Sequence, residues 1–273
     1  MPARVHNVAD AAGPDQWFRA LPIVTQYWFG ATMVCTLAGN FGIISPMQLI
    51  YSWPQIKNNF ELWRILTPFC YAGSFSFGTL ITCYMLVNMS KQYEKGGPYN
   101  TGAGGGTADY VFALMFGMVM TLITYPLVLM YSFTGPIFCK SLVFFVLYVW
   151  SKRFPTQQAS IWGVPVPAVY LPFAYLALTI FMGNPYMDLV HGMAVGHLYY
   201  FLAEVVPRVH GKDLLVTPQF LIDQIGIGEY TPAAPTRNPA DVPRGWGGAA
   251  AQQPPAAAGG HQWGGGGRAL GRE

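Results

Sequence analysis

Charged residues are scarce in this sequence of 273 residues. Asp, Glu, Lys and Arg together make up 10% of it, whereas hydrophobic residues make up 52%. The mean hydropathy is +0.31 even though the C-terminal stretch is polar. Several apolar runs approach the roughly 20 residues that a helix needs to cross a bilayer. The composition therefore predicts an all-α polytopic membrane protein.

Three further features are missing. Residues 1–20 are polar and lack a hydrophobic core, so we expect no cleavable signal peptide, with the first span acting as its own signal. No Gly-x-x-x-x-Gly-Lys-Ser/Thr loop for a nucleotide occurs, so energy for any transport must come from another protein. The four cysteines lack metal-ligand spacing and are interpreted as small hydrophobic residues; they are Cys35, Cys70, Cys83 and Cys139. We predict no cofactor and no metal.

Six apolar stretches are candidate transmembrane spans. They are residues 21–44, 72–91, 109–130, 136–150, 166–183 and 186–206. The fourth is short, because about 14 residues at 1.5 Å each reach only about 21 Å across a hydrocarbon core of about 30 Å. A helix of that length must be shielded by its neighbours or must thin the bilayer locally.

The basic residues indicate a topology. With six crossings, 12 of the 15 Lys and Arg residues fall on one side of the membrane. These are Arg4, Arg19, Lys91, Lys95, Lys152, Arg153, Arg208, Lys212, Arg237, Arg244, Arg268 and Arg272. Only Lys57, Arg64 and Lys140 fall on the other side. The positive-inside rule makes the richer side cytosolic, and both termini with it.

The chain then divides into three parts. Residues 1–20 are a cytosolic N-terminal segment, and residues 21–206 are a six-helix membrane domain. A long lumenal loop at 45–71 is rich in aromatic residues and leucine but is broken by three prolines, so we expect short amphipathic helices at the interface. Residues 207–273 form a cytosolic tail that is Pro-, Gly- and Ala-rich, with disorder predicted from about residue 223.

Two motifs stand out in the membrane domain. Trp63 and Arg64 end the lumenal loop, where an arginine can bond carbonyls or lipid headgroups and a tryptophan suits the interface. An ordinary interfacial anchor explains them equally well. Gly192 and Gly196 form a Gly-x-x-x-Gly pair in the sixth stretch, which permits close helix packing but is common in membrane helices.

Four polar residues share the sixth stretch: Asp188, His191, His197 and Glu204. Such groups are costly in a membrane unless they are paired, so they indicate a packed interior or a water-accessible cavity. We interpret Asp188 and Glu204 as markers of the two helix ends and leave the histidines open.

The tail carries one motif of its own. Trp263 and Leu270 are large apolar side chains, and Gly265 and Gly267 lie between them. An extended segment of this kind can occupy a partner's groove, because the glycines allow close backbone approach while the large side chains fill pockets. Low-complexity sequence is the alternative, since Trp246 stands in a similar glycine string. The fuller spacing favours a partner-binding motif.

Several segments together resemble the Derlin family, rhomboid-related pseudoproteases of the endoplasmic reticulum, over residues 15–225. The resemblance is closest to its Derlin-1 type and plant-type members. The matching segments are DQWFRALPIVTQYWFGAT from residue 15, GIISP at 42–46, FELWRILTPF at 60–69, ADYVFALMF at 108–116, VLYVWSKR at 146–153, YLPFAYLAL at 170–178, VGHLYYFL at 195–202 and LLVTPQFL at 214–221.

The resemblance implies a rhomboid-like six-helix fold and a role in endoplasmic-reticulum-associated degradation. Such a protein aids retrotranslocation of misfolded lumenal and membrane proteins to the cytosol. The tail motif looks like the family's SHP box, which recruits a cytosolic AAA ATPase of the valosin-containing protein type. Trp263 and Leu270 would then be anchors, and Arg268 would face an acidic rim. The other implied partners are a membrane ubiquitin-ligase complex, misfolded client polypeptides, the lipid bilayer and further copies of the chain; nucleic acid is not among them.

The resemblance also implies that the chain is not a protease. Active rhomboids place a serine in a Gly-x-Ser-Gly turn before the fourth span, where residues 132–141 read SFTGPIFCKS. Their histidine lies three residues before the first glycine of Gly-x-x-x-Gly, a position held by Leu189. His191 is two residues away, about 200° round the helix. An active intramembrane serine protease is therefore disfavoured, and so is a small-solute transporter, because we find no internal repeat.

Overall fold

The computed structural model describes residues 13–96, 106–131, 135–161, 164–211 and 213–225. The chain separates into two units, Met1–Pro235 and Thr236–Glu273. The second unit lies wholly outside the described residues, and with it Trp263, Gly265, Gly267, Arg268 and Leu270 of the predicted tail motif. The architecture below is therefore that of the first unit.

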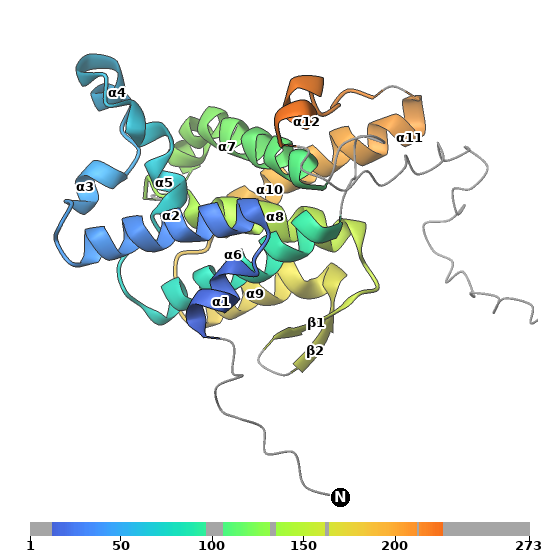
Figure 1. Ribbon diagram of the computed structural model, residues 1–273, viewed down its shortest axis with the longest axis horizontal. Helices are drawn as coiled ribbons and strands as arrows, with labels where there is room; N and C mark the ends of the chain where they lie inside the picture. The colour runs from blue at the N-terminus through green and yellow to red at the C-terminus, as the bar shows by residue number, and fades with distance from the viewer. Residues whose placement is uncertain (1–12, 97–105, 132–134, 162–163, 212, 226–273) are drawn as a thin grey trace, which may run out of the picture. The chain divides into compact units, whose positions relative to one another are not determined.

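Most of the described residues are helical (Figure 1). The longer helices are α2 (Ile23–Asn40), α6 (Phe77–Gly96), α7 (Gly106–Tyr131), α8 (Cys139–Arg153), α9 (Leu171–Phe181) and α10 (Met187–Tyr200). The shorter ones are α1 (Pro14–Arg19), α3 (Pro46–Leu49), α4 (Trp53–Asn59), η2 (Leu62–Ile65), α5 (Thr67–Cys70), η3 (Ala168–Tyr170), α11 (Val206–His210) and α12 (Gln219–Ile225). A π-helical segment, η4 (Phe201–Val205), joins α10 to α11 without a break.

A helix fills most of each apolar stretch of the sequence. Two of the described helices, Gly106–Leu129 and Met187–His210, are long and apolar enough to cross a membrane by length and composition, and Ala168–Phe181 is a shorter apolar helix. The mostly helical architecture with apolar helices agrees with the predicted class. Six crossings stay a prediction.

Helix α8 forms the centre of the core, with α6, α7, α9 and α10 packed around it (Figure 1). Its side chains are buried on every face, and Phe145, Leu147 and Val149 are fully inaccessible. The sequence is compatible with this position, because a helix that is apolar on every side can be covered by other helices on every side. The remaining elements are arranged by their contacts with α8.

The loop at 45–71 consists of the short helices α3, α4, η2 and α5, as its prolines and aromatics predicted. Its large apolar side chains are mostly exposed: Met47, Trp53, Phe60, Leu62, Trp63 and Leu66. Two backbone bonds fix the loop to the segment before α8, from Tyr51 N to Pro136 O at 3.0 Å and from Phe138 N to Pro68 O at 2.9 Å. The loop is therefore attached at its base and presents apolar side chains outward.

Two elements were not predicted. The antiparallel strands β1 (Gln158–Ile161) and β2 (Val164–Pro167) form a hairpin between α8 and α9, with Gln158 opposite Pro167. Helix α12 packs on α7, with Leu221 and Ile222 buried. Thr217, just before α12, donates a 2.6 Å hydrogen bond to the carboxylate of Asp109 on α7.

Candidate functional site

Helices α8 and α10 share the most extensive helix–helix contact among the described residues, and the Gly-x-x-x-Gly pair lies in it. A Cβ atom at Gly192 would lie 2.1 Å from the main-chain oxygen of Ser141, which no real side chain can occupy. At Gly196 a Cβ atom would lie 3.1 Å from the main-chain oxygen of Phe145 and 3.1 Å from Cβ of Tyr148. The two glycines therefore let the backbones of α8 and α10 touch.

The two histidines of α10 face different neighbours. His197 pairs through Nδ1 with the hydroxyl of Tyr148 on α8 at 2.9 Å, and the two rings meet edge to face. His191 pairs through Nε2 with the hydroxyl of Thr124 on α7 at 2.7 Å. The sequence left the role of both histidines open. In the structure each histidine links α10 to an adjacent helix.

The Thr124–His191 pair is poorly arranged for nucleophilic chemistry. The hydroxyl of Thr124 also lies 2.6 Å from the main-chain oxygen of Met120 and donates to it. A hydroxyl has a single proton, so the ring nitrogen of His191 must be the donor in their shared bond. An imidazole nitrogen that carries a proton cannot act as the base for that hydroxyl.

The serine near the start of α8 is occupied elsewhere. Ser141 is buried, and its hydroxyl donates to the main-chain oxygen of Asp188 at 2.9 Å. Leu189, at the position where a rhomboid has its histidine, is buried and 3% exposed. Between described residues, no serine hydroxyl lies within hydrogen-bonding distance of a histidine ring.

Arg64 organises the loop at 45–71. It lies in η2 and is buried, and its guanidinium group donates to the Glu61 carboxylate and to the main-chain oxygens of Met47 and Ile50. All three partners belong to the loop, so Arg64 joins its short helices to one another. Trp63 beside it is 52% exposed.

Glu204 corrects one interpretation of the sequence. It does not mark a helix end, because η4 and α11 continue the helix to His210. Its carboxylate pairs with Arg153 of α8 at 3.1 Å and with Arg208 at 2.8 Å. Arg153 also donates to the hydroxyl of Tyr93 on α6 at 2.6 Å. One arginine thus joins α6, α8 and η4.

Sequence reasoning also missed a buried carboxylate near the end of α6. Glu94 is 5% exposed and accepts hydrogen bonds from the backbone amides of Val24 at 3.1 Å and Thr25 at 3.0 Å. It accepts a third from the hydroxyl of Thr25, which also touches Ser90. The only signal in the sequence is an acidic residue at the end of an otherwise apolar stretch.

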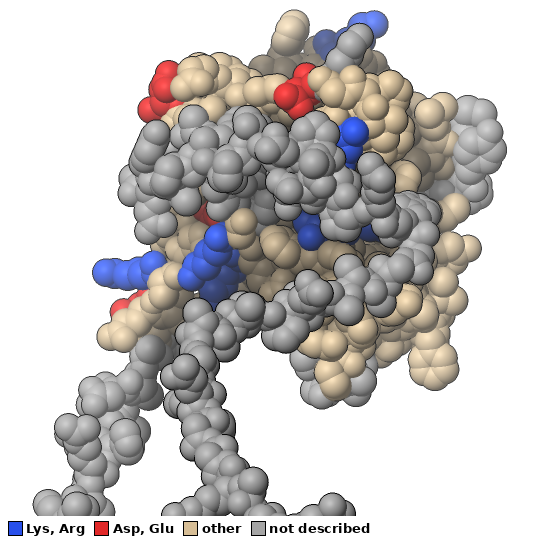
Figure 2. All heavy atoms as spheres, turned by 90° about the vertical axis from the view of Figure 1, so that its right-hand side faces the viewer, with Lys and Arg blue, Asp and Glu red and all other residues tan. Residues whose placement is uncertain are grey.

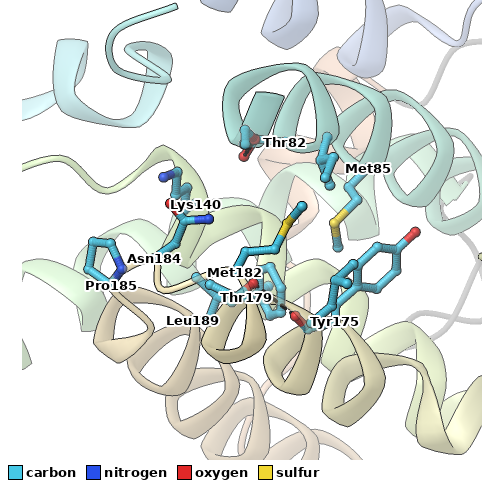
Figure 3. Close-up of a pocket in the computed structure, with 13 residues that line it drawn as sticks. Thr82, Met85, Lys140, Tyr175, Thr179, Met182, Asn184, Pro185 and Leu189 are labelled. Atoms are coloured by element: carbon cyan, nitrogen blue, oxygen red, sulfur yellow. Dashed lines mark hydrogen bonds between the residues drawn. The ribbon is translucent and has the colours of Figure 1, made fainter. Parts of the chain in front are cut away.

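A small cavity lies on the other side of α8, between α6 and α9 (Figure 3). Its volume is about 50 Å³, room for a few water molecules. Thr82, Met85, Tyr175 and Thr179 line its sides, and Lys140 lies at one end. A wider hollow of about 580 Å³ separates the lumenal loop from α7 and is lined largely by aromatic and proline side chains.

Neither a metal nor a reactive thiol emerges from this geometry. Within the described ranges, no three of His, Cys, Asp and Glu converge on a point where a metal ion could bind. In the lumenal loop, burial raises the pKa of the Cys70 thiol to about 11. The described residues therefore form a packed helical core held by glycines and polar pairs.

Comparison with known proteins agrees with this geometry. Residues 21–219 match the model of the Der1-like family. The chain is 34% identical to Derlin-1 of Homo sapiens over 241 residues, which cover 85% of this chain and 92% of that protein. It is 33% identical to Derlin-1 of Arabidopsis thaliana over 211 residues, covering 77% and 76%, and 32% identical to Derlin-2.1 of Zea mays over 219 residues, covering 77% and 86%.

Proposed function

Because this chain belongs to the Der1-like family, we propose that it acts in endoplasmic-reticulum-associated degradation by helping misfolded proteins reach the cytosol. Family membership supports a Derlin-like role in this degradation and a place in the endoplasmic reticulum membrane. The observation that carries the proposal is the family match over residues 21–219, because it spans the whole helical core described above. Retrotranslocation itself is the finer step that we propose.

The core would lower the barrier to a polypeptide by thinning the membrane. The apolar helix Ala168–Phe181 leaves Phe173 and Ile180 exposed, and its 1.5 Å rise per residue carries it only about 21 Å against a hydrocarbon core of about 30 Å. A polar chain that passes beside so short a helix crosses less hydrocarbon, which reduces the cost of its unpaired backbone groups. Gly192, Gly196 and His197 would hold α10 against α8 at the centre of this core.

The lumenal loop would support the same function from the other side. Arg64 keeps its short helices together, and Trp63 with the neighbouring exposed apolar side chains would anchor them in the interface. The core would help clients cross the membrane without cleaving them. Family membership supports a rhomboid-like pseudoprotease, and the partners of Ser141, Thr124 and His191 fit that description.

The energy for extraction would come through the tail. Trp263, Gly265, Gly267, Arg268 and Leu270 lie outside the described residues, and their role rests on the resemblance to an SHP box. We propose that they recruit the cytosolic AAA ATPase, while the membrane domain contacts a ubiquitin-ligase complex. About 40 residues of Pro-, Gly- and Ala-rich linker before the motif give a reach on the order of 35 Å.

Deletion of residues 262–273 tests the coupling. In cells that depend on this chain, the deletion should abolish co-purification of the ATPase and stabilise a misfolded client in a chase experiment, while membrane insertion stays normal. The double substitution Trp263→Ala and Leu270→Ala should reproduce both effects. Trp246→Ala is the matched control, because it removes a tail tryptophan outside the motif. Unchanged recovery of the ATPase from the deletion variant would refute the recruitment role.

A further inference from the structure

A basic cavity lies where α6 and α8 end. Its volume is about 290 Å³, and its lining includes Lys91, Gln92 and Lys95 of α6, Trp150 of α8 and Gln157 beyond α8. None of its described lining residues is acidic. Figure 2 looks onto this side of the molecule and shows several Lys and Arg side chains there, with Asp and Glu side chains near some of them. The cavity is thus a positively charged recess between two helices.

The charge of this recess is not neutralised by its surroundings. Lys91 and Lys95 are one helical turn apart, and no ion pair involves either of them among the described residues. The nearest acidic residue on the helix, Glu94, is already bonded to the amides at the start of α2. A lysine in the last turn offsets the helix dipole. The helix dipole explains Lys95 but not Lys91. It also does not explain why Gln92 and Gln157 line the same recess.

A further hollow follows the recess along α6. Gln92 also lines a second cavity of about 180 Å³, together with Met89 and Leu171 between α6 and α9. Met85 and Tyr175 line both this second cavity and the small cavity of Figure 3. From Gln92 to Tyr84, the extent of the second cavity along α6, the helix rises by about 12 Å, most of the roughly 15 Å of one bilayer leaflet. The second cavity is lined by apolar side chains such as Met85, Met89 and Leu171 beside the polar Asn88 and Gln158, and its apolar part can hold an acyl chain next to a headgroup in the recess.

We propose that Lys91 and Lys95 bind the phosphate-bearing headgroup of an anionic phospholipid, with one acyl chain in the second cavity between α6 and α9. Basic recesses between membrane helices on the cytosolic side suit such headgroups. The amides of Gln92 and Gln157 can bond headgroup hydroxyls or ester oxygens. A volume of about 290 Å³ accommodates a headgroup without the rest of the lipid. The leaflet is the one that the positive-inside rule makes cytosolic.

Native mass spectrometry of the full chain in detergent tests the site. The probes are dioctanoyl phosphatidylinositol phosphate, dioctanoyl phosphatidylserine, dioctanoyl phosphatidylcholine and free inositol phosphate. The variant is Lys91→Gln with Lys95→Gln. Its matched control, Lys57→Gln with Lys152→Gln, removes the same charge from positions that do not line the recess. Thermal unfolding of each variant checks that it is folded.

The anionic lipids should bind the natural chain more tightly than phosphatidylcholine. The Lys91/Lys95 variant should bind them about thirtyfold more weakly, which corresponds to about 2 kcal/mol for two lysines, and the control should bind them normally. Retained binding in the Lys91/Lys95 variant, or an equal loss in the control, overturns the site. Free inositol phosphate that binds as tightly as its lipid overturns the acyl-chain site and assigns the recess to a soluble anion.

Discussion

Gly192 and Gly196 belong to one motif but have different surroundings. A methyl group at Gly192 would press on the main chain of α8, which cannot yield without moving the helix. At Gly196 the nearest atoms lie 1.0 Å farther away, at 3.1 Å against 2.1 Å. The consequence is that the first glycine fixes the distance between the helices, while the second tolerates a small adjustment.

We therefore expect Gly192→Ala to lower the free energy of unfolding by about 3 kcal/mol and Gly196→Ala by about 1 kcal/mol, the upper and lower parts of the range for overpacking. Thermal or denaturant unfolding of the purified variants in one detergent measures the difference. Equal losses in the two variants would contradict the packing described for α8 and α10.

Cys70 gives a second test at this scale. Burial raises the pKa of its thiol to about 11, and the thiolate is the form that reacts with maleimides. The thiol therefore stays protonated between pH 7 and pH 9, and we expect slow labelling of Cys70 across that range. Peptide mapping after brief treatment with N-ethylmaleimide measures it. Protein unfolded in detergent is the control and should label fully; fast labelling of the folded protein would mean that the thiol is open to solvent.

At the scale of elements, the helices could be predicted and their polar connections could not. Long apolar runs mark helices such as α7 and α8 because hydropathy is a local property of the sequence. The polar pairs join residues far apart: Thr25 and Glu94 are separated by 69 positions, Arg153 and Glu204 by 51, and Asp109 and Thr217 by 108. No local pattern reveals such partners.

The same contrast between local patterns and long-range contacts explains why the β1–β2 hairpin was missed and why the α8–α10 contact was predicted only in part. The β1–β2 hairpin has strands of four residues with prolines at 165 and 167, so no alternating pattern marks it. The spacing of Gly192 and Gly196 could be read from the sequence. The identity of the facing atoms on Ser141 and Phe145 required the three-dimensional arrangement.

The contact between α6 and α2 makes a prediction of its own. Glu94→Ala removes the acceptor for two backbone amides and for the hydroxyls of Thr25 and Thr107, so we expect a loss of stability of about 2–3 kcal/mol and faster hydrogen exchange at Val24 and Thr25. Thr25→Val is the matched comparison, since it removes only the hydroxyl and leaves the carboxylate on the amides. Hydrogen exchange read by mass spectrometry distinguishes the two. Slow exchange at both amides in Glu94→Ala would show that the carboxylate is dispensable.

At the scale of the whole molecule, the distribution of charge determines orientation. Twelve basic residues on one side against three on the other predict cytosolic termini. A glycosylation acceptor and an epitope tag added after Glu273 should stay unglycosylated in microsomes, and protease should remove the tag without detergent. Glycosylation of the added acceptor would place the C-terminus in the lumen, and the tail could not meet a cytosolic ATPase.

The pairing of Glu94 with the start of α2 also bears on the order in which the protein is made. The first turn of α2 has no side-chain cap of its own, and its acceptor lies in a helix synthesised about 70 residues later. At about 5–20 residues per second, roughly 4–14 s pass before that carboxylate emerges. Throughout that interval the amides of Val24 and Thr25 in α2 must find their hydrogen-bond acceptors in water or in other chains. We therefore expect α2 and α6 to settle as a pair during biosynthesis, with α2 held by the insertion machinery until α6 is made.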